Sequence, residues 1–364
     1  MKFLIIHVIT TIDLGGAEKQ LLTLAQSQKN GGAEVEIIFL KGSPSLLESF
    51  RQSDIKVKTE FYGLNFLQQF LLLRKRTSSN EVVFHAHLPR SELLCALALR
   101  PKSFVVTRHN SEPFFPKAPS FISRALSRFV LSKAKVCIAI SQAVADFLQN
   151  QGELTKSTKV IVIHYGLSKS IVEKRELIES EIPRKLELGT IARLVPQKNV
   201  PLLLKAVQII KSDIDLDCHL TIAGTGPLRQ ELKLMSVNLG IELDVTWVGQ
   251  IHEVADLYQQ IDLFVLSSNY EGFGLVLLEA MASGVPVVAR RISAIPEVLG
   301  KDHPGLIESD NPKEMALKIE ELLTVPETRA RCLDYQSQQL YKFSIEITRT
   351  SHNVIYKSVL GRNS

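Results

Sequence analysis

The chain has few cysteines and no long apolar run, and both absences narrow its class. Its 364 residues include only four cysteines, which are widely spaced in apolar contexts. No spacing among them is typical of a zinc site or a disulfide framework, so we expect buried free thiols in a reducing cytoplasm. No apolar run approaches the roughly 18 residues needed to span a bilayer. The apolar start at 3–9 is short and contains His7, which favours a buried first strand over an export signal.

Acidic residues are scarce in the first half of the chain. Residues 1–175 carry 24 Lys and Arg against 13 Asp and Glu, whereas residues 176–364 carry 19 against 25. The formal charge of +5 is therefore the sum of a basic half and an acidic half. A basic half predicts an anionic partner, and charge alone leaves nucleic acid and an anionic membrane surface open.

Short apolar, β-branched runs alternate with helical patterns along the whole chain. Such alternation is typical of parallel sheets built from βαβ units, and 364 residues suffice for two cores. The pattern predicts an α/β protein with two Rossmann-like, doubly wound domains. The predicted strands are 3–9, 35–40, 82–86, 104–107, 136–140, 160–163, 187–191, 218–223, 244–248, 262–266, 286–289 and 304–307.

The charged stretch 168–185 marks the predicted domain boundary, because it lacks a convincing apolar stripe and precedes a fresh strand. We predict a first domain over 1–172, a second over 173–343 and a C-terminal helical segment over 344–364.

The most informative stretch is 269–289, NYEGFGLVLLEAMASGVPVVA, a glycine turn followed by a helix and an apolar strand. Gly272 and Gly274 permit close approach to a ligand, and the next helix points its N-terminal amides into the same space, which suits a phosphate. Glu271 precedes the turn, and Glu279 lies about one and a half turns into the helix. Because carboxylates repel phosphate, we expect both to accept hydrogen bonds from hydroxyls, one on a ribose and one on a sugar. The stretch therefore predicts a nucleotide-sugar site.

The same stretch resembles the signature of the retaining glycosyltransferases of family 4 (group 1) in residue types, spacing and flanking strands. The resemblance implies two Rossmann-like domains facing across a cleft, the GT-B architecture, and a C-terminal helix over 344–364 that returns to the first domain. It implies that Glu279 holds the nucleotide ribose and that Glu271 orients the sugar. It further implies that the donor contacts the turn through Gly272, Phe273, Gly274 and Leu275.

Two cations, Arg193 and Lys198, follow the first strand of the predicted second domain in RLVPQKN. Ligands of open α/β sheets bind beyond the carboxyl ends of strands. A planar guanidinium and a compact ammonium can neutralise a diphosphate leaving group there, although two solvated surface cations are the alternative. The segment is similar to the family pattern, which implies that both side chains contact the donor diphosphate.

Two further glycine turns follow strands. Gly224 and Gly226 form a Gly-x-Gly, but Arg229 occupies the third glycine position, which disfavours a nicotinamide dehydrogenase. The segment AGTGPLR resembles the base- and ribose-side loop of the family. Gly15 and Gly16 open the first helix, and similar turns line the cleft in the family. Plain tight turns are the alternative at both places.

Three histidines, His85, His87 and His109, lie near strand ends in the first half. No tight His/Asp/Glu spacing accompanies them, so core histidines with satisfied hydrogen bonds are a better interpretation than a metal site. His109 matches a histidine that contacts the transferred sugar in the family, and His87 and Arg90 are weaker candidates beside it.

The aspartates Asp213, Asp215 and Asp217 form the Asp-x-Asp pattern of metal-binding glycosyltransferases with the other major architecture. They precede a strand, whereas a ligand site should follow one. We therefore expect solvated turn residues, no essential metal, and no cofactor beside the nucleotide-sugar co-substrate.

One loop departs from the family pattern. In ARRISAIPEVLG, Ile292, Ser293 and Ala294 replace the usual glycines. We expect this loop to be stiffer and bulkier, and a ligand role for Glu297 stays open.

Basic residues surround an apolar stripe on the predicted helix within 119–135. Neighbouring prolines predict that Phe114 and Phe115 are exposed, and a second apolar segment ends in the basic run 74–76. Core-facing helices and docking on anionic lipid are both compatible with these patterns. No aromatic platform or recognition motif supports nucleic acid as a partner. The stripe consists of Phe121, Ile122, Ala125, Leu126, Phe129 and Val130.

These patterns predict a retaining, metal-independent glycosyltransferase that moves a sugar from a nucleotide-diphosphate sugar, foremost a UDP-sugar, to an acceptor hydroxyl. The resemblance implies a lipid-linked glycan acceptor in bacterial surface-glycan synthesis (lipopolysaccharide, capsule or O-antigen). We expect a cytoplasmic protein, with peripheral attachment to the inner face of the cytoplasmic membrane as one option. The catalytic candidates are Arg193, Lys198, Glu271 and His109.

Two alternatives belong to other classes. A catalytically silent homologue acting as a binding subunit would be indicated by loss of Arg193, Lys198 or Glu271, and all three are present. A non-hydrolysing nucleotide-sugar epimerase would need acid and base groups poised at a sugar carbon, and no pair can be nominated.

Overall fold

The computed structural model describes residues 3–76, 81–168, 185–251 and 253–361. The chain forms two compact units, the first from Met1–Leu167 with Phe343–Ser364 and the second from Ser168–Lys342. The predicted boundary at 172/173 lies outside the described residues. Each unit is therefore described by itself.

Unit 1 contains a seven-stranded sheet in the order β3-β2-β1-β4-β5-β6-β7, in which all neighbours are parallel. Its central strands are buried along almost their whole length, because helices cover both faces of the sheet, and they include buried histidines among the apolar residues. The strands are β1 (Leu4–Ile9), β2 (Glu34–Phe39), β3 (Lys56–Lys58), β4 (Val82–His87), β5 (Phe104–Arg108), β6 (Val136–Ala139) and β7 (Val160–Val162).

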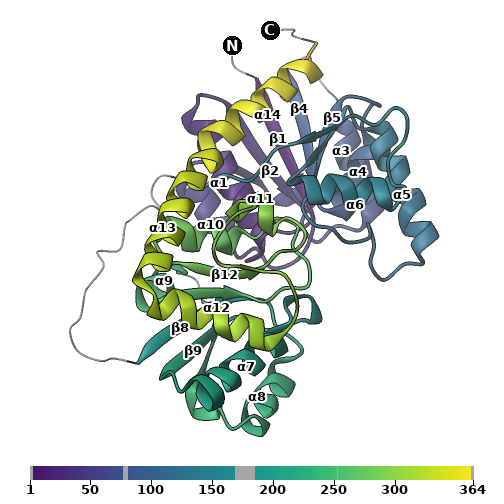
Figure 1. Cartoon of the computed structure of the whole chain (residues 1–364). Helices are drawn as coiled ribbons and strands as arrows, with labels where there is room; N and C mark the ends of the chain where they lie inside the picture. The colour runs from purple at the N-terminus through teal and green to yellow at the C-terminus, as the bar shows by residue number, and fades with distance from the viewer. Residues whose placement is uncertain (1–2, 77–80, 169–184, 252, 362–364) are drawn as a thin grey trace. The chain divides into compact units, whose positions relative to one another are not determined.

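The helices of unit 1 come mostly from the first half of the chain, with one exception. The last helix, α14 (Ile345–Val359), packs against α1 within this unit (Figure 1). Its Tyr356 is fully buried against the strand residues Ile5, Val83 and Val105. The remaining helices are α1 (Gly16–Asn30), α2 (Leu47–Gln52), α3 (Phe66–Lys75), α4 (Pro89–Ala98), α5 (Ser120–Lys133) and α6 (Gln142–Asn150).

The two chain segments of unit 1 are hydrogen-bonded where they meet. The Leu167 amide donates to the Phe343 carbonyl at 2.8 Å, and the Ile345 amide donates to the Leu167 carbonyl at 3.0 Å. Gly166 is required beside them, because a Cβ there would lie 2.7 Å from the Ile345 backbone. The α14 segment is thus tied to the end of the first segment.

Unit 2 contains a six-stranded parallel sheet in the order β10-β9-β8-β11-β12-β13. Its core packs the sheet against α7 and α12, which contact each other. The strands are β8 (Leu186–Ile191), β9 (Cys218–Ala223), β10 (Val245–Gly249), β11 (Leu263–Leu266), β12 (Val287–Arg290) and β13 (Leu306–Ile307). The helices are α7 (Val200–Ile209), α8 (Arg229–Asn238), α9 (Ala255–Gln260), α10 (Leu275–Ala282), α11 (Ile295–Leu299), α12 (Pro312–Thr324) and α13 (Pro326–Leu340).

The predicted fold class, two Rossmann-like α/β domains, is confirmed by these sheets. All twelve predicted strands are present, and one further strand, β3, was not predicted. It is a short edge strand of sequence Lys-Val-Lys, so it has almost no apolar pattern. Among the described residues, no helix is long and apolar enough to cross a bilayer.

The predicted exposure of Phe114 and Phe115 is wrong. Phe114 is only 1% exposed, because its ring packs 4.5 Å from the Arg108 guanidinium, and Phe115 is half-buried. The loop folds inward where the Phe115 amide donates to Ser123 Oγ at 2.9 Å.

The predicted stripe on α5 is only partly correct. Val130 is buried, but Phe121 is 70% exposed and Ile122 is also exposed. The buried face instead runs through Ser123 and Ser127, since Ser127 Oγ accepts a hydrogen bond from the buried Arg108 at 2.9 Å. A polar cluster beneath the helix therefore displaces the apolar residues toward its outer face.

Candidate active site

Lys198 and Glu271 form an ion pair in unit 2. Lys198 Nζ lies 2.6 Å from Glu271 Oε1, which also accepts from Ser268 Oγ at 2.6 Å. Glu271 is only 5% exposed and belongs to the loop between β11 and α10. Lys198 belongs to the loop after β8, the strand that pairs with β11. The parallel sheet therefore brings two sequence-predicted residues together at its carboxyl edge.

Hydrogen bonds to backbone carbonyls join the two loops that carry this pair. The Asn269 amide donates to the Gln197 carbonyl at 2.7 Å, and Ser267 Oγ donates to the Lys198 carbonyl at 2.9 Å. Asn199 adopts a left-handed conformation (φ 44°), which turns the chain into α7 directly after Lys198. The position of the Lys198 ammonium is thus fixed by its surroundings.

The side chain of Arg193 is exposed and makes no hydrogen bond or ion pair with another described residue. A second guanidinium, that of Arg290, was not predicted from the sequence to lie near the site. Arg290 ends β12 and donates to Asn269 Oδ1 at 2.8 Å, so it lies at the loop that carries Glu271. A cation directly after the apolar run of β12 was the available signal. The carboxyl edge of this sheet therefore carries three cations, two in the loop after β8 and one at the end of β12.

The helix α10 begins after Gly274, whose φ of 92° lies in the left-handed region that glycine tolerates. Glu279 is the fifth residue of this eight-residue helix. The single hydroxyl proton of Tyr258 is shared between the Val276 carbonyl at 2.9 Å and Glu279 Oε2 at 3.3 Å. Burial and this carboxylate raise the pKa of Tyr258, so its hydroxyl stays protonated and orients Glu279. Tyr258 was not predicted from the sequence.

The packing of unit 2 explains why glycine occupies positions 224 and 226. A Cβ on Gly224 would lie 1.9 Å from the Ala192 carbonyl oxygen, and one on Gly226 would lie 2.4 Å from the Leu194 carbonyl oxygen. These glycines therefore allow the 224–226 turn to pack on the backbone around Arg193. This packing explains both glycines as a tight turn, and their contact with a donor stays a prediction.

The loop that departs from the family pattern touches Glu271. Ser293 has φ 54°, a conformation that costs a residue with a Cβ, and its Oγ donates to the Glu271 carbonyl at 2.7 Å. Ala294 is fully buried, and Glu297 lies in the first turn of α11. The loop is therefore pinned to the backbone of a predicted site residue.

The Asp213, Asp215 and Asp217 side chains are exposed and precede β9. They do not lie at the carboxyl edge where Lys198 and Glu271 meet.

In unit 1, Gly15 is the N-cap of α1, and Gly16 is its first residue. A Cβ on Gly15 would lie 2.2 Å from Glu18 Oε2. A carboxylate beside this turn disfavours an anionic ligand and suits a ligand that offers hydroxyls.

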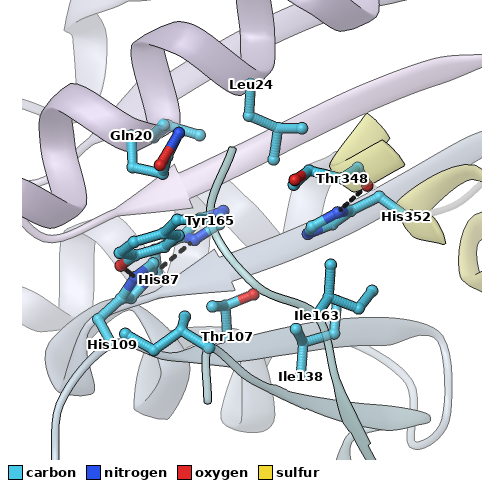
Figure 2. A pocket seen from close by; sticks show the side chains of 12 residues that line it. Gln20, Leu24, His87, Thr107, His109, Ile138, Ile163, Tyr165, Thr348 and His352 are labelled. Carbon is cyan, nitrogen blue, oxygen red and sulfur yellow. Dashed lines mark hydrogen bonds between the residues drawn. The ribbon is translucent and has the colours of Figure 1, made fainter. Parts of the chain in front are cut away.

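His109 is half-buried just after β5, and both of its ring nitrogens have partners (Figure 2). Its Nε2 lies 3.0 Å from His87 Nδ1, and its Nδ1 bonds to the Tyr165 hydroxyl. Burial lowers the pKa of His109 to about 3, so the ring is neutral. Arg90, the weaker candidate, instead donates to Gln69 Oε1 at 3.1 Å.

His7, His85 and His87 bring ring nitrogens within 4.8 Å of one another, the spacing of a possible metal site. Each ring nitrogen of the three is hydrogen-bonded: His7 to His87 and Gln28, His85 to Tyr356 and Thr107, and His87 to His109 and His7. An ion would have to displace these bonds, so the cluster fits a hydrogen-bond network better than a ligand set.

A small cavity lies beside this network, between Gln20, Thr107, His109, Tyr165 and His352 (Figure 2). Its volume of about 20 Å³ suffices for one water molecule. The buried Gln20 Oε1 has no partner among the described residues, so it provides an acceptor for such a water.

Comparison with known proteins decides the family. The model described as Glycosyltransferase Family 4 matches residues 14–170, and that described as Glycosyl transferases group 1 matches residues 173–339. The chain belongs to the family 4 glycosyltransferases. The predicted family and enzyme class are thereby confirmed: this glycosyltransferase moves a sugar from a nucleotide sugar to an acceptor.

The curated relatives of this glycosyltransferase match over most of their length. It is 26% identical over 357 residues, 93% of this chain and 94% of the other, to a Campylobacter jejuni GalNAc-alpha-(1->4)-GalNAc-alpha-(1->3)-diNAcBac-PP-undecaprenol alpha-1,4-N-acetyl-D-galactosaminyltransferase. It is 26% identical over 315 residues, 83% and 82% of the two chains, to the lipopolysaccharide core biosynthesis mannosyltransferase LpsB of Rhizobium meliloti.

Solved structures of similar fold include HepE of Anabaena in complex with UDP and glucose. The TM-score is 0.83 at 19% identity, covering 98% of this chain and 100% of that one. The sucrose-phosphate synthase of Thermosynechococcus elongatus matches with a TM-score of 0.76 at 18% identity, over 99% and 100% of the two chains. Both comparisons confirm the GT-B fold class.

Proposed function

We propose that this glycosyltransferase is retaining and metal-independent, and that it uses a UDP-sugar to extend a lipid-linked bacterial surface glycan. The observation that carries the proposal is the Lys198–Glu271 ion pair at the carboxyl edge of the unit 2 sheet, near the exposed Arg193. The two curated relatives, one named for an undecaprenol-linked glycan and one for lipopolysaccharide core synthesis, support the acceptor class. UDP in the HepE complex supports the donor class.

In the proposed mechanism, Lys198 and Arg193 stabilise the charge that develops on the departing diphosphate, together with the amides at the start of α10. The turn Gly272–Leu275 lets the diphosphate approach these amides. Unit 2 is the donor-binding domain and unit 1 the acceptor-binding domain. The acceptor hydroxyl attacks the face that the diphosphate leaves, and the diphosphate takes its proton, so no enzyme nucleophile is required.

The remaining residues hold hydroxyl groups. Glu279, oriented by Tyr258, accepts from the nucleotide ribose. Glu271 accepts from the transferred sugar while it holds Lys198, and His109 contributes from unit 1. The turn at Gly15 and Gly16, with Glu18 beside it, receives hydroxyls of the acceptor.

Unit 1 also has a surface suited to anionic lipid, which would hold the enzyme at the inner face of the cytoplasmic membrane. On α3, Leu67 and Leu71 are 64% and 50% exposed, and the exposed Arg74 follows them. On α5, the exposed Phe121 is followed by the exposed Arg124. Both helices pack against α4 (Figure 1). Apolar side chains beside cations are the composition that binds an anionic membrane interface.

The test is a thermal-shift panel of UDP-, GDP- and ADP-sugars with and without EDTA, followed by product analysis with and without a lipid-linked acceptor. We expect a UDP-sugar to raise the Tm in EDTA and to be consumed with retention when the acceptor is present. Binding without turnover on any acceptor would support a silent binding subunit. An epimerised nucleotide sugar formed without acceptor would support an epimerase.

A further inference from the structure

A continuous chain of hydrogen bonds crosses the sheet of unit 1 from Tyr165 to Gln28. The Tyr165 hydroxyl bonds to His109 Nδ1, and His109 Nε2 lies 3.0 Å from His87 Nδ1. His87 Nε2 lies 2.9 Å from His7 Nδ1, and His7 Nε2 lies 2.9 Å from Gln28 Oε1. Parallel pairing of β1 with β4, and of β4 with β5, places these groups on one face of the sheet.

The three imidazole rings in this chain of hydrogen bonds are neutral. His7 is fully buried and His87 is 2% exposed, while His109 is half-buried. Burial lowers the pKa of all three, to about 4 for His7 and to about 3 for His109. Nearby His352 and Arg108 lower the pKa of His109 further, and no carboxylate is among the causes that act on the three rings. A neutral imidazole has one donor and one acceptor nitrogen, so each ring passes on the direction of its neighbour's hydrogen bond.

Gln28 gives the chain its direction. A carbonyl oxygen only accepts, so His7 Nε2 must donate to Gln28 Oε1, which makes His7 Nδ1 an acceptor. His87 Nε2 must then donate to His7 Nδ1, and His87 Nδ1 becomes an acceptor. By the same step, His109 Nε2 donates to His87, and His109 Nδ1 accepts from the Tyr165 hydroxyl.

The C-terminal helix holds the amide of Gln28 in this orientation. Gln28 Nε2 donates to the Tyr356 hydroxyl oxygen at 3.2 Å, and the Tyr356 hydroxyl donates to His85 Nδ1 at 2.8 Å. His85 Nε2 then donates to Thr107 Oγ1 at 2.7 Å. Both ends of the amide are therefore used, so a reversal at Gln28 would require every group in both branches to reverse together.

We propose that Gln28 is a positioning residue that sets the tautomer of His109 through His7 and His87. His109 keeps its proton on Nε2, bonded to His87, and presents Nδ1 as an acceptor. A sugar hydroxyl that reaches Nδ1 must donate to it in place of the Tyr165 hydroxyl. His109 thus receives a hydrogen bond from the sugar and does not act as an acid. This last step rests on the proposed role of His109 in the donor complex.

The first experiment is ¹⁵N NMR of the full-length protein labelled at histidine, at pH 7.5. We expect His7, His87 and His109 to show the Nε2–H tautomer, with no imidazolium form. The Nδ1–H tautomer or an imidazolium signal in any of the three would overturn the inference. This experiment needs no substrate and no variant, so it stands apart from the proposed function.

The second experiment compares Gln28→Met with Gln26→Met, a glutamine on the same helix that instead donates to Ser53 Oγ at 2.8 Å. We expect Gln28→Met to give mixed tautomers at His7 and to raise the donor KM about 10-fold, and Gln26→Met to change neither. Unmixed Nε2–H signals in folded Gln28→Met would overturn the inference.

Two variants separate the inference from the role of His109. Tyr165→Phe keeps the chain from His109 to Gln28, so we expect the Nε2–H tautomer at His109 to persist, and its loss would overturn the inference. If the tautomers are as expected but His109→Ala transfers sugar at the wild-type rate, the proposed role of His109 fails while the tautomer assignment stands.

Discussion

Lys198 Nζ lies 2.6 Å from Glu271 Oε1, so two residues 73 positions apart form one charged unit at the edge of the unit 2 sheet. Their side chains are 14% and 7% exposed. The carboxylate orients the ammonium and lowers its cost of burial before any donor binds. A diphosphate that approaches Lys198 therefore meets a cation whose position is already set, which is the arrangement that stabilises developing charge most effectively.

The first prediction concerns this pair. Lys198→Ala and Glu271→Ala should each reduce kcat by at least about 10²–10³-fold, because either change removes the positioned charge. Transfer assays at saturating donor, together with circular dichroism, measure this effect. Each single variant should also lose about 1–3 kcal/mol of stability because it leaves the other group unpaired, and the double variant should recover part of it. Near-normal turnover in both single variants would contradict the assignment.

Arg193 should behave differently, because its side chain is exposed and has no partner among the described residues. Arg193→Met should leave the free energy of unfolding within about 0.5 kcal/mol of wild type and still lower kcat/KM by at least about 10-fold. The control is Arg331→Met, an exposed arginine on α13. Equal kinetics in the two variants would remove Arg193 from the site.

Ser293 permits the hydrogen bond to Glu271 and the strain of its φ of 54° to be tested separately. Ser293→Ala removes the bond but keeps the strain, so it should lose about 1 kcal/mol of stability. Ser293→Gly removes both, and the relief of roughly 1 kcal/mol should leave stability near the wild-type value. Both should raise the donor KM, because the Glu271 loop is no longer pinned. Urea denaturation and donor titration measure the two effects, and an unchanged KM in both variants would show that the bond does not position Glu271.

The histidines of unit 1 predict a loss of stability in mild acid. Burial lowers the pKa of His7 and His352 to about 4 and that of His109 to about 3, whereas an unfolded histidine has a pKa of about 6.5. Below pH 6.5 the histidines of the unfolded chain bind protons, whereas these buried histidines stay neutral in the folded unit. The stabilisation is therefore complete above pH 6.5 and is lost as the pH falls toward 4, by at most about 1.4 kcal/mol per pH unit for each histidine.

The fluorescence of the single tryptophan allows the unfolding of unit 2 to be followed by itself. Trp247 lies on β10 of unit 2, whereas circular dichroism reports on both units. Among the described residues of unit 2, one buried histidine has a comparably lowered pKa, His303. Urea unfolding at pH 5 should therefore show an earlier transition by circular dichroism than by tryptophan fluorescence, and the gap should be smaller at pH 7.5. Coincident midpoints at both pH values would contradict the prediction.

Membrane docking predicts binding to anionic vesicles. Phe121→Ser and Leu67→Ser should each weaken binding about 10- to 100-fold, since burial of one such side chain is worth about 1.5–3 kcal/mol. Leu243→Ser is the control, because Leu243 is 84% exposed but belongs to unit 2. Co-sedimentation with vesicles of defined charge measures the effect. Equal binding to neutral and anionic vesicles, or unchanged binding of the two unit 1 variants, would contradict the proposal.

The sequence predicted the sheets well because their buried strands are short, mostly apolar and β-branched segments that alternate with helical patterns. From the sequence, Lys198 was predicted to contact the diphosphate and Glu271 to contact the sugar, and no ion pair between them was predicted. Their direct pairing depends on the adjacency of β8 and β11, which lie far apart in the chain.

The hydrogen-bond partners of the histidines could not be predicted from the sequence for a similar reason. The i, i+2 spacing of His85 and His87 placed both on one face of a strand. The partners come from the register of β1 with β4 and from Tyr356 on the last helix, and no local pattern encodes either. The exposure of Phe114 was predicted wrongly because the buried Arg108 that receives its ring lies in the preceding strand.

The hydrogen bonds between Leu167 and the Phe343–Ile345 segment have a consequence for the order of the units along the chain. Unit 2 is one continuous segment inserted into unit 1, a host domain whose two cut ends, Leu167 and Phe343, are hydrogen-bonded to each other. A short linker from Leu167 to Phe343 should therefore yield unit 1 as an independent protein. Exchange of residues 168–342 as a cassette would give the same host a different second domain without moving either of its cut ends.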